Sequence, residues 1–135
     1  MALIVVRHAW AGKQSEWEGD DSKRPLDARG ERQARELVDR LASWPIDEIH
    51  TSPYTRCVQT VVPLAAVRGL EPILRDELGV EQQYQDGGAL LQGLADRDAL
   101  VCGHGGLESW LVDAPKWKKG AAFVVDGSLN IVDQI

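Results

Sequence analysis

The sequence contains only two cysteines, and it has neither a long apolar run nor an excess of positive charge. Cys57 and Cys102 lie in apolar surroundings without a partner at metal-site spacing, so we predict that both are reduced, buried thiols. No apolar stretch approaches the ~20 residues that cross a membrane, and residues 3–6 are too short for a signal-peptide core. We therefore expect a cytoplasmic protein that does not enter a membrane.

The charge balance restricts the kinds of partner that the protein can bind. The 135 residues include 15 lysines and arginines against 21 aspartates and glutamates, which gives a formal net charge of −6. This balance argues against recognition of nucleic acid or an anionic membrane through bulk charge, so basic residues are expected to act locally. The length suits a single domain over residues 1–135, and nothing in the composition predicts an oligomeric state.

Apolar runs alternate with helical patterns along most of the chain, which is typical of α/β folds. The expected strands are residues 3–6, 48–51, 72–76 and 98–103, with two more in 121–134 joined by a turn at 126–127. The expected helices are a segment capped by Asp27, residues 53–69, 87–97 and 106–112. Pro63 should kink or split the second helix. This order predicts a three-layer α/β/α fold around a mostly parallel sheet.

Charged and polar residues follow three of the expected strands. In open α/β sheets ligands bind beyond the carboxyl ends of the strands, so these three segments should meet in one pocket. A pocket with two arginines and two histidines at helix N-termini suits a phosphoryl group. The residues concerned are Arg7, His8, Ser52, Arg56, Gly103 and His104.

Four segments form an ordered pattern: "VVRHA" at 5–9, "RPLDARGERQA" at 24–34, "TSPYTRCVQT" at 51–60 and "VCGHGG" at 101–106. Together they resemble the histidine phosphatase superfamily, whose fold is also called phosphoglycerate-mutase-like. The chain is similar in particular to small phosphatases of the SixA type and to the histidine phosphatase domain fused to some bacterial Nudix hydrolases. No Nudix signature occurs in the sequence.

The resemblance implies a covalent mechanism that uses no metal ion or other cofactor. His8 would attack phosphorus through Nε2, which requires a neutral ring whose other nitrogen is protonated and bonded to a backbone carbonyl. Arg7, Arg56 and a protonated His104 would surround the three non-bridging oxygens of the phosphoryl group. The expected product of the first step is a transient phosphohistidine.

The resemblance also implies a carboxylic acid that protonates the leaving oxygen and later activates water. Family members usually carry a glutamate two positions after a leucine, whereas Val80 stands there in this sequence and Glu81 follows one residue later. Glu81 is therefore the preferred acid and Glu77 the alternative. The chain has no room for the lid of larger members, so transfer of the phosphoryl group to water is expected rather than mutase chemistry.

Several polar and aromatic residues near these motifs are assigned a binding or a structural role. Arg24 is either a surface charge or part of a rim that attracts a polyanionic substrate. His50 is interpreted as structural, and Asp20 and Asp21 as a solvated polar loop rather than metal ligands. The residues expected to contact substrate are Trp10, Arg24, Ser52 and Gly105.

These features predict an enzyme that removes a terminal phosphoryl group by hydrolysis. A phosphohistidine protein, a nucleotide and a small phosphate ester all present such a group, so the sequence leaves the substrate open. The alternative is a regulatory module that binds a phosphate or a phosphorylated protein without turnover, because a shared fold does not guarantee activity.

Overall fold

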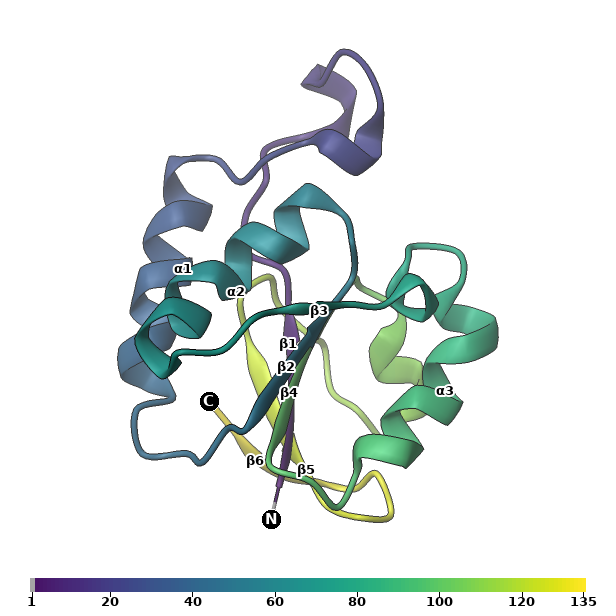
Figure 1. Ribbon diagram of the computed structural model, residues 1–135. Coiled ribbons are helices and arrows are strands. Elements are labelled where there is room, and N and C mark those ends of the chain that lie inside the picture. Colours follow the sequence, from purple (N-terminus) through teal and green to yellow (C-terminus); the bar gives the residue numbers. More distant parts are fainter. Residues whose placement is uncertain (1) are drawn as a thin grey trace.

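The computed structural model describes residues 2–135, which form a sheet covered by helices on both faces (Figure 1). The strands are β1 (Leu3–Arg7), β2 (Glu48–Thr51), β3 (Ile73–Leu74), β4 (Ala99–Gly103), β5 (Ala122–Val125) and β6 (Ile131–Gln134). Their order across the sheet is β3-β2-β4-β1-β5-β6, with β1 to β4 parallel and β5 and β6 antiparallel to their neighbours. The predicted α/β fold with a mostly parallel sheet is confirmed.

β1 lies in the middle of the sheet because its side chains are apolar on both faces. Ile4 and Val6 pack into one core cluster and Leu3 and Val5 into the other, and all four are fully buried. This alternation follows from the two-residue period of a strand, and it anchors β1 between two hydrophobic layers. The end of β1 is therefore held rigidly in place.

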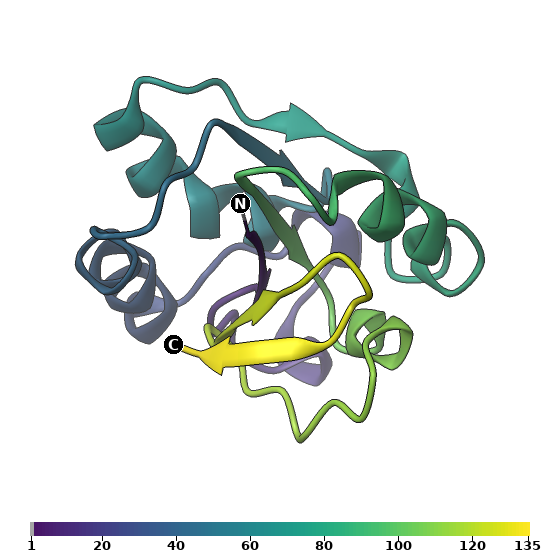
Figure 2. The same ribbon diagram turned by 90° about the horizontal axis from the view of Figure 1, so that it is seen from below.

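The helices divide between these two layers (Figure 2). On the face of Ile4 and Val6 lie α1 (Ala28–Arg40) and α2 (Thr55–Arg68), and on the face of Leu3 and Val5 lie α3 (Gln83–Leu94) and the short 3-10 helix Leu107–Trp110. No helix within residues 2–135 is long and apolar enough to cross a membrane.

Local signals explain where the helices begin and end. The Asp27 carboxylate accepts a hydrogen bond from the Gly30 amide at 2.8 Å and caps α1, as predicted. A Cβ atom at Gly30 would lie 1.9 Å from the Trp10 carbonyl oxygen, so glycine lets α1 start directly against the segment that follows β1. α2 ends at Gly69, whose φ of 67° is left-handed.

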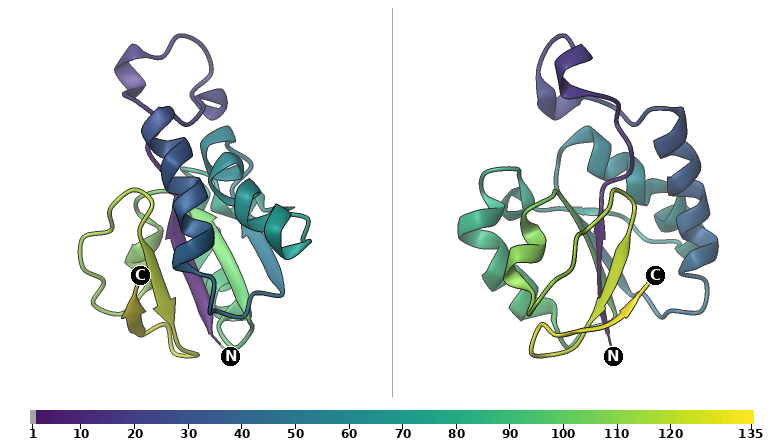
Figure 3. Two further views of the ribbon diagram at one scale, coloured as in Figure 1. Left: turned by 90° about the vertical axis from the view of Figure 1, so that its left-hand side faces the viewer. Right: turned by 180° about the vertical axis from the view of Figure 1, so that it is seen from behind.

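Four expected elements differ from the structure. The helix expected at 87–97 is α3, which begins at Gln83 and ends at Leu94, and the strand expected at 72–76 is only the short β3. The helix that contains Pro63 is not split, because Val61, Leu64 and Ala65 are buried on both sides of the proline and hold α2 against the sheet. The helix expected at 106–112 is reduced to the 3-10 helix Leu107–Trp110. Residues 11–27 form a separate arm beyond the carboxyl end of β1 and contain two short 3-10 helices (Figure 3).

Candidate active site

The predicted site residues gather at the carboxyl ends of β1, β2 and β4. The His8 amide donates to the Gly103 carbonyl at 3.0 Å and the Ser52 amide donates to the Cys102 carbonyl at 3.0 Å, so sheet pairing continues to the site. A cavity of about 530 Å³ opens there, and we name it the His8 cavity. Its lining includes Arg7, His8, Arg56, His104, Gly105 and Lys119.

The His8 ring is fixed in one protonation state. Its Nδ1 lies 2.7 Å from the Ala9 carbonyl oxygen, which can only accept, so Nδ1 carries the proton and Nε2 keeps its lone pair. Burial is the largest of the effects that lower the pKa of His8 to about 3, and the charges of His104, Arg56 and Arg7 add to it, whereas the Ala9 hydrogen bond opposes them. His8 is therefore neutral near pH 7.

The backbone around His8 is tied to α2. The Ala9 amide donates to Thr60 Oγ1 at 3.0 Å, and the Thr60 hydroxyl donates to the Arg56 carbonyl at 2.7 Å. Thr60 is 1% exposed. This chain of hydrogen bonds sets the position of His8 relative to the helix that carries Arg56.

Both predicted arginines line the same cavity as His8, and each has an N–H donor without an acceptor in the part of the protein that the structure describes. Arg7 Nη1 donates to the Trp117 carbonyl at 2.7 Å, whereas both Arg56 terminal nitrogens bond to Asp21. Among residues 2–135, no acceptor bonds to the buried Nε of either arginine. Because an unpaired buried N–H is costly, an anion that brings oxygens into the cavity would be favoured.

His104 lies close to His8, and Ser52 and Cys57 contact its ring. The two ring centroids are 5.5 Å apart, and His104 is 3% exposed. Ser52 Oγ lies 2.9 Å from His104 Nε2, and Cys57 Sγ lies 3.6 Å from the same nitrogen. Ser52 was expected to contact substrate, but the structure places it fully buried under His104 and outside the cavity lining.

Gly105 makes room for one of these arginines. A Cβ atom at Gly105 would lie 2.9 Å from the Arg7 guanidinium carbon, so a larger residue would displace the side chain. Gly105 also lines the His8 cavity, as expected for a residue at its wall. The Gly103-His104-Gly105 turn therefore serves both Arg7 and His104.

Asp21 is a component that the sequence did not reveal as part of the site. Its carboxylate lies 3.1 Å from Arg56 Nη2 and 2.9 Å from Arg24 Nε. Burial acts to raise the pKa of Asp21, but hydrogen bonds and charges from Arg24 and Arg56 outweigh it and keep this pKa below its usual value. Asp21 is thus an ionised partner of two arginines rather than a member of a solvated loop.

The other residues of this polar loop have local roles. Asp20 accepts a hydrogen bond from the Ser22 amide at 2.9 Å and caps the short helix Asp21–Lys23. In the described part of the chain, no three or more histidine, cysteine, aspartate or glutamate side chains could together hold a metal ion.

Neither candidate acid reaches the cavity wall. Val80 lines the His8 cavity, whereas Glu81, the next residue, is exposed outside it. Glu77 lies 3.9 Å from the Arg75 guanidinium and does not line the His8 cavity. Over residues 2–135, no aspartate or glutamate is part of the cavity lining.

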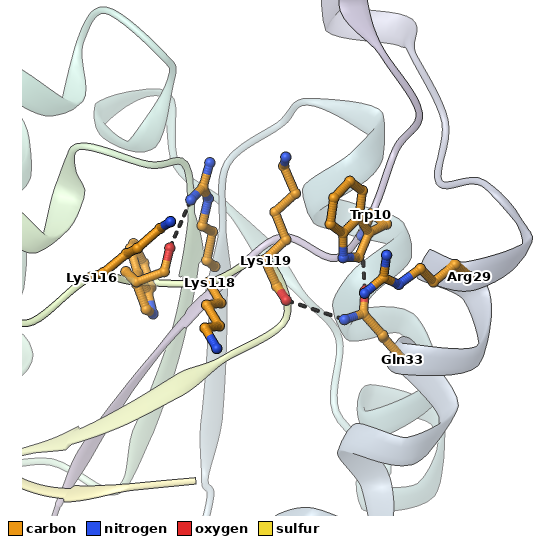
Figure 4. A pocket seen from close by; sticks show the side chains of 8 residues that line it. Trp10, Arg29, Gln33, Lys116, Lys118 and Lys119 are labelled. Carbon is orange, nitrogen blue, oxygen red and sulfur yellow. Dashed lines mark hydrogen bonds between the residues drawn. The ribbon is translucent and has the colours of Figure 1, made fainter.

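Trp10 and Arg24 both line the rim of the cavity. The Trp10 indole faces two cations, with Arg29 Cζ 4.3 Å and Lys119 Nζ 4.2 Å from its ring centroid (Figure 4). Lys119 and Arg29 are far apart in the sequence. Arg29 lies within the segment 24–34 that carries the family resemblance but was not predicted as a site residue, whereas no local pattern linked Lys119 to the motifs. The three lysines within residues 116–119 were the only available signal for Lys119.

Comparisons with known proteins agree with this arrangement. The model of the histidine phosphatase superfamily (branch 1) matches residues 3–86. An 8-oxo-(d)GTP phosphatase of Mycolicibacterium smegmatis is 41% identical over 83 residues, which are 61% of this chain and 25% of that protein. The chain therefore spans only about a quarter of that relative's length.

Solved structures show the same fold over the whole chain. A protein histidine phosphatase SixA complexed with tungstate has a TM-score of 0.82 at 24% identity and covers 100% of this chain and 96% of its own. A putative phosphohistidine phosphatase SixA from Agrobacterium tumefaciens has a TM-score of 0.79 at 20% identity, with 99% and 96% covered. At these identities the likeness concerns the fold alone.

Proposed function

The chain belongs to the histidine phosphatase superfamily (branch 1), and on that basis we propose that it hydrolyses a terminal phosphoryl group through a phosphohistidine on His8. One observation carries this proposal: a buried, neutral His8 with a free Nε2 lies among cationic donors. A neutral imidazole nitrogen is a nucleophile, and the cations favour the negative charge that phosphoryl transfer spreads over three oxygens.

The proposed first step transfers the phosphoryl group to the protein. The lone pair of His8 Nε2 forms a bond to phosphorus while the bond from phosphorus to the leaving oxygen breaks. Arg7 and Arg56 donate hydrogen bonds to the phosphoryl oxygens, which then replace part of the Asp21 contact to Arg56. His104, which also lines the cavity, completes the cluster.

The proposed second step regenerates the enzyme. Water adds its oxygen to phosphorus, and the electron pair of the P–N bond returns to His8 Nε2. The Ala9 carbonyl keeps the proton on Nδ1 throughout, so the same nitrogen is ready for the next turn. Inorganic phosphate leaves through the cavity mouth.

The general acid remains part of the proposal for substrates with poor leaving groups. Glu81 directly follows Val80 in the cavity wall, so a rotation of this short turn would bring its carboxyl group to the cavity. Glu77 is the alternative. Substrates whose leaving group departs readily would not need either residue.

The relatives suggest two substrate classes whose leaving group departs readily without a general acid. A nucleotide is suggested by the relative named as an 8-oxo-(d)GTP phosphatase, and a phosphohistidine protein by the structures named as SixA. A small phosphate ester is the third class. The second candidate function is binding of a phosphorylated partner without turnover, which the lack of a carboxylate in the described cavity lining favours.

A rapid-quench experiment tests the proposed function. Wild-type protein is mixed with a substrate labelled in its terminal phosphoryl group and quenched in base after milliseconds. We expect an acid-labile, base-stable label on the peptide that contains His8, followed by release of labelled phosphate. His8→Ala protein is the control and should carry no label. Binding of phosphate without label or release would favour the module without turnover.

A further inference from the structure

A second cavity adjoins the His8 cavity and has no assigned role. It encloses about 400 Å³ and shares Arg7, Trp10 and Lys119 with the first cavity. We name it the lysine cavity. Figure 4 shows Arg29 and Gln33 from α1 on one side and the lysines of the 116–119 loop on the other.

The lysine cavity is strongly cationic in an otherwise acidic chain. Five of its eight lining residues are lysine or arginine, although the chain carries a net charge of −6. Among residues 2–135, no carboxylate forms an ion pair with Arg29, Lys118 or Lys119. Unpaired cations gathered in one hollow repel one another, and an anion placed among them removes that repulsion.

Lys119 lies among these cations. Burial is the largest cause that lowers the pKa of Lys119, and the positive charges of Arg7, Arg24 and Arg29 lower it further. Its ammonium group also lies against the Trp10 ring at the boundary between the two cavities. A bound anion that reaches from one cavity into the other would pass this lysine.

Hydrogen bonds between side chains and backbone groups hold the walls of the lysine cavity in position. Gln33 accepts from the Trp10 amide at 3.0 Å and donates to the Lys119 carbonyl at 3.1 Å, so one side chain joins both walls. Arg7 donates to the Trp117 carbonyl at 2.7 Å, and Trp117 itself is 2% exposed. Only the cationic ends of the side chains are left to adjust to a ligand, which reduces the entropy lost on binding.

We propose that the lysine cavity binds a second phosphate of the substrate, which makes the substrate an organic diphosphate rather than a monophosphate. This inference rests on the proposed function of His8. The terminal phosphoryl group lies at His8, and the phosphate that bears the organic group lies among Arg29, Lys118 and Lys119. The two cavities share Arg7, Trp10 and Lys119, so one substrate can reach from His8 into the lysine cavity.

The chemistry of the leaving group agrees with this assignment. As His8 Nε2 bonds to the terminal phosphorus, the anhydride P–O bond breaks and its electron pair goes to the oxygen of the departing organic phosphate. Such a phosphate has its second pKa near ~6, so it leaves as a dianion near pH 7 without a proton from the enzyme. Water then adds to phosphorus, its two protons stay on the released H₂PO₄⁻, and the P–N electron pair returns to His8.

This step explains a site without a carboxylate in the described lining of either cavity. An alkoxide leaving group needs a general acid, whereas an organic phosphate needs cations that stabilise its developing negative charge. The lysine cavity supplies such cations. A phosphohistidine protein would release a neutral imidazole instead, which gains nothing from five positive charges.

The test compares a diphosphate with a monophosphate in matched variants. Arg29→Gln combined with Lys118→Gln removes two cations that line only the lysine cavity. Arg32→Gln is the control, because Arg32 is exposed on the same helix but lines neither cavity. kcat/KM is measured with methyl diphosphate and with p-nitrophenyl phosphate.

We expect the double variant to lose about tenfold or more in kcat/KM on methyl diphosphate, a typical effect of two charged contacts, and less than about twofold on p-nitrophenyl phosphate. Arg32→Gln should change neither substrate by more than about twofold. An equal loss on both substrates, or no loss on the diphosphate, would overturn the second phosphate site.

Binding separates this inference from the proposed function. Calorimetry with His8→Asn protein measures the affinity for methyl diphosphate and for methyl phosphate without turnover. We expect the diphosphate to bind at least about tenfold more tightly, and the double variant to abolish that preference. Equal affinities would refute the inference even if His8 is labelled, whereas a preference without His8 labelling would refute the proposed function alone.

Discussion

His8 and His50 are both buried histidines, yet their surroundings differ in one decisive respect. They are 5% and 1% exposed, and burial is the leading cause that lowers the pKa of each. His50 Nδ1 accepts from Arg75 Nε at 3.0 Å, and its Nε2 lies 3.2 Å from Glu48 Oε1, off the best hydrogen-bond angle. His8 uses only Nδ1 and leaves Nε2 free at a cavity.

The charges around the two rings also differ, because His50 has both an anion and the cations Arg75 and Arg97 near it. Glu48 acts to raise the pKa of His50, whereas only cations surround His8 and lower its pKa further. Burial and a lowered pKa therefore do not distinguish a functional histidine from a structural one in this protein. A free nitrogen that faces a cationic cavity does.

The largest expected difference is between substitutions of the two histidines. His8→Asn should lower kcat/KM by about 10⁴-fold or more, because it removes the nucleophile. His50→Asn should change kcat/KM by less than about threefold but lower the free energy of unfolding by ~1–3 kcal/mol, because Arg75 loses its acceptor. Steady-state kinetics and urea unfolding measure the two effects. Comparable losses of kcat/KM in both variants would contradict the assignment of His8 as catalytic and His50 as structural.

The arginines beside the two rings extend the comparison. Arg7→Gln should lower kcat by about 10²–10³-fold, because one donor to the phosphoryl oxygens is lost in the transition state. Arg75→Gln should lower kcat by less than about threefold, since Arg75 contacts His50 and Glu77 and lines neither cavity. Inhibition by vanadate should weaken in Arg7→Gln alone, and circular dichroism checks that both variants fold.

The missing carboxylate at His8 gives the third prediction. If Glu81 serves as the acid, Glu81→Gln should slow an alkyl phosphate by ~10²-fold but p-nitrophenyl phosphate much less, because nitrophenolate leaves without a proton. Glu77→Gln tests the alternative acid and should leave both substrates unchanged in that case. A flat result for both glutamates would mean that the enzyme acts only on substrates with good leaving groups.

Asp21 is the carboxylate nearest to the cations of the His8 site, and its removal should have a smaller effect. Asp21→Asn should tighten vanadate inhibition by about fivefold, because the anion no longer competes with a carboxylate for Arg56. Asp20→Asn is the control, since Asp20 contacts only its own loop. Weaker vanadate inhibition in Asp21→Asn would show instead that Asp21 positions Arg56.

The smallest effect is spectroscopic and concerns protonation. ¹⁵N NMR should show His8 with its proton on Nδ1 and His50 with its proton on Nε2, because their partners are an acceptor and a donor respectively. With a folded pKa of about 3, His8 should stay neutral down to pH 5. The unfolded chain takes up this proton near pH ~6.5, so the contribution of His8 to stability is lost as pH falls from there toward 3.

The strand ends that form the centre of the site could be predicted from the sequence. Arg7-His8 and Gly103-His104 each end an apolar run, and the carboxyl ends of parallel strands meet at one edge of a sheet. This sequence pattern is local, because each apolar strand is directly followed by the site residues that it positions. The same logic identified Arg56 at the start of the helix after β2.

Other parts of the site depend on contacts that no local pattern encodes. The Arg7 side chain bonds to Trp117, 110 residues away, and this contact brings the lysines of the 116–119 loop to the site. Asp21 reaches Arg56 only because the arm of residues 11–27 folds back over α2. Whether Glu81 or Val80 faces the cavity is decided by one residue of a short turn, below the precision of a sequence pattern.

The central position of β1 has a consequence for how the protein folds. Leu3 pairs with Ala99 and with Val125, so the strand made first along the chain finds its neighbours only after nearly all of the chain is available. Contacts so distant in sequence carry a large loop-closure cost and form late, which slows folding. Because His8 follows directly on that strand, recovery of phosphate release after dilution from urea should coincide with the last and slowest phase of refolding.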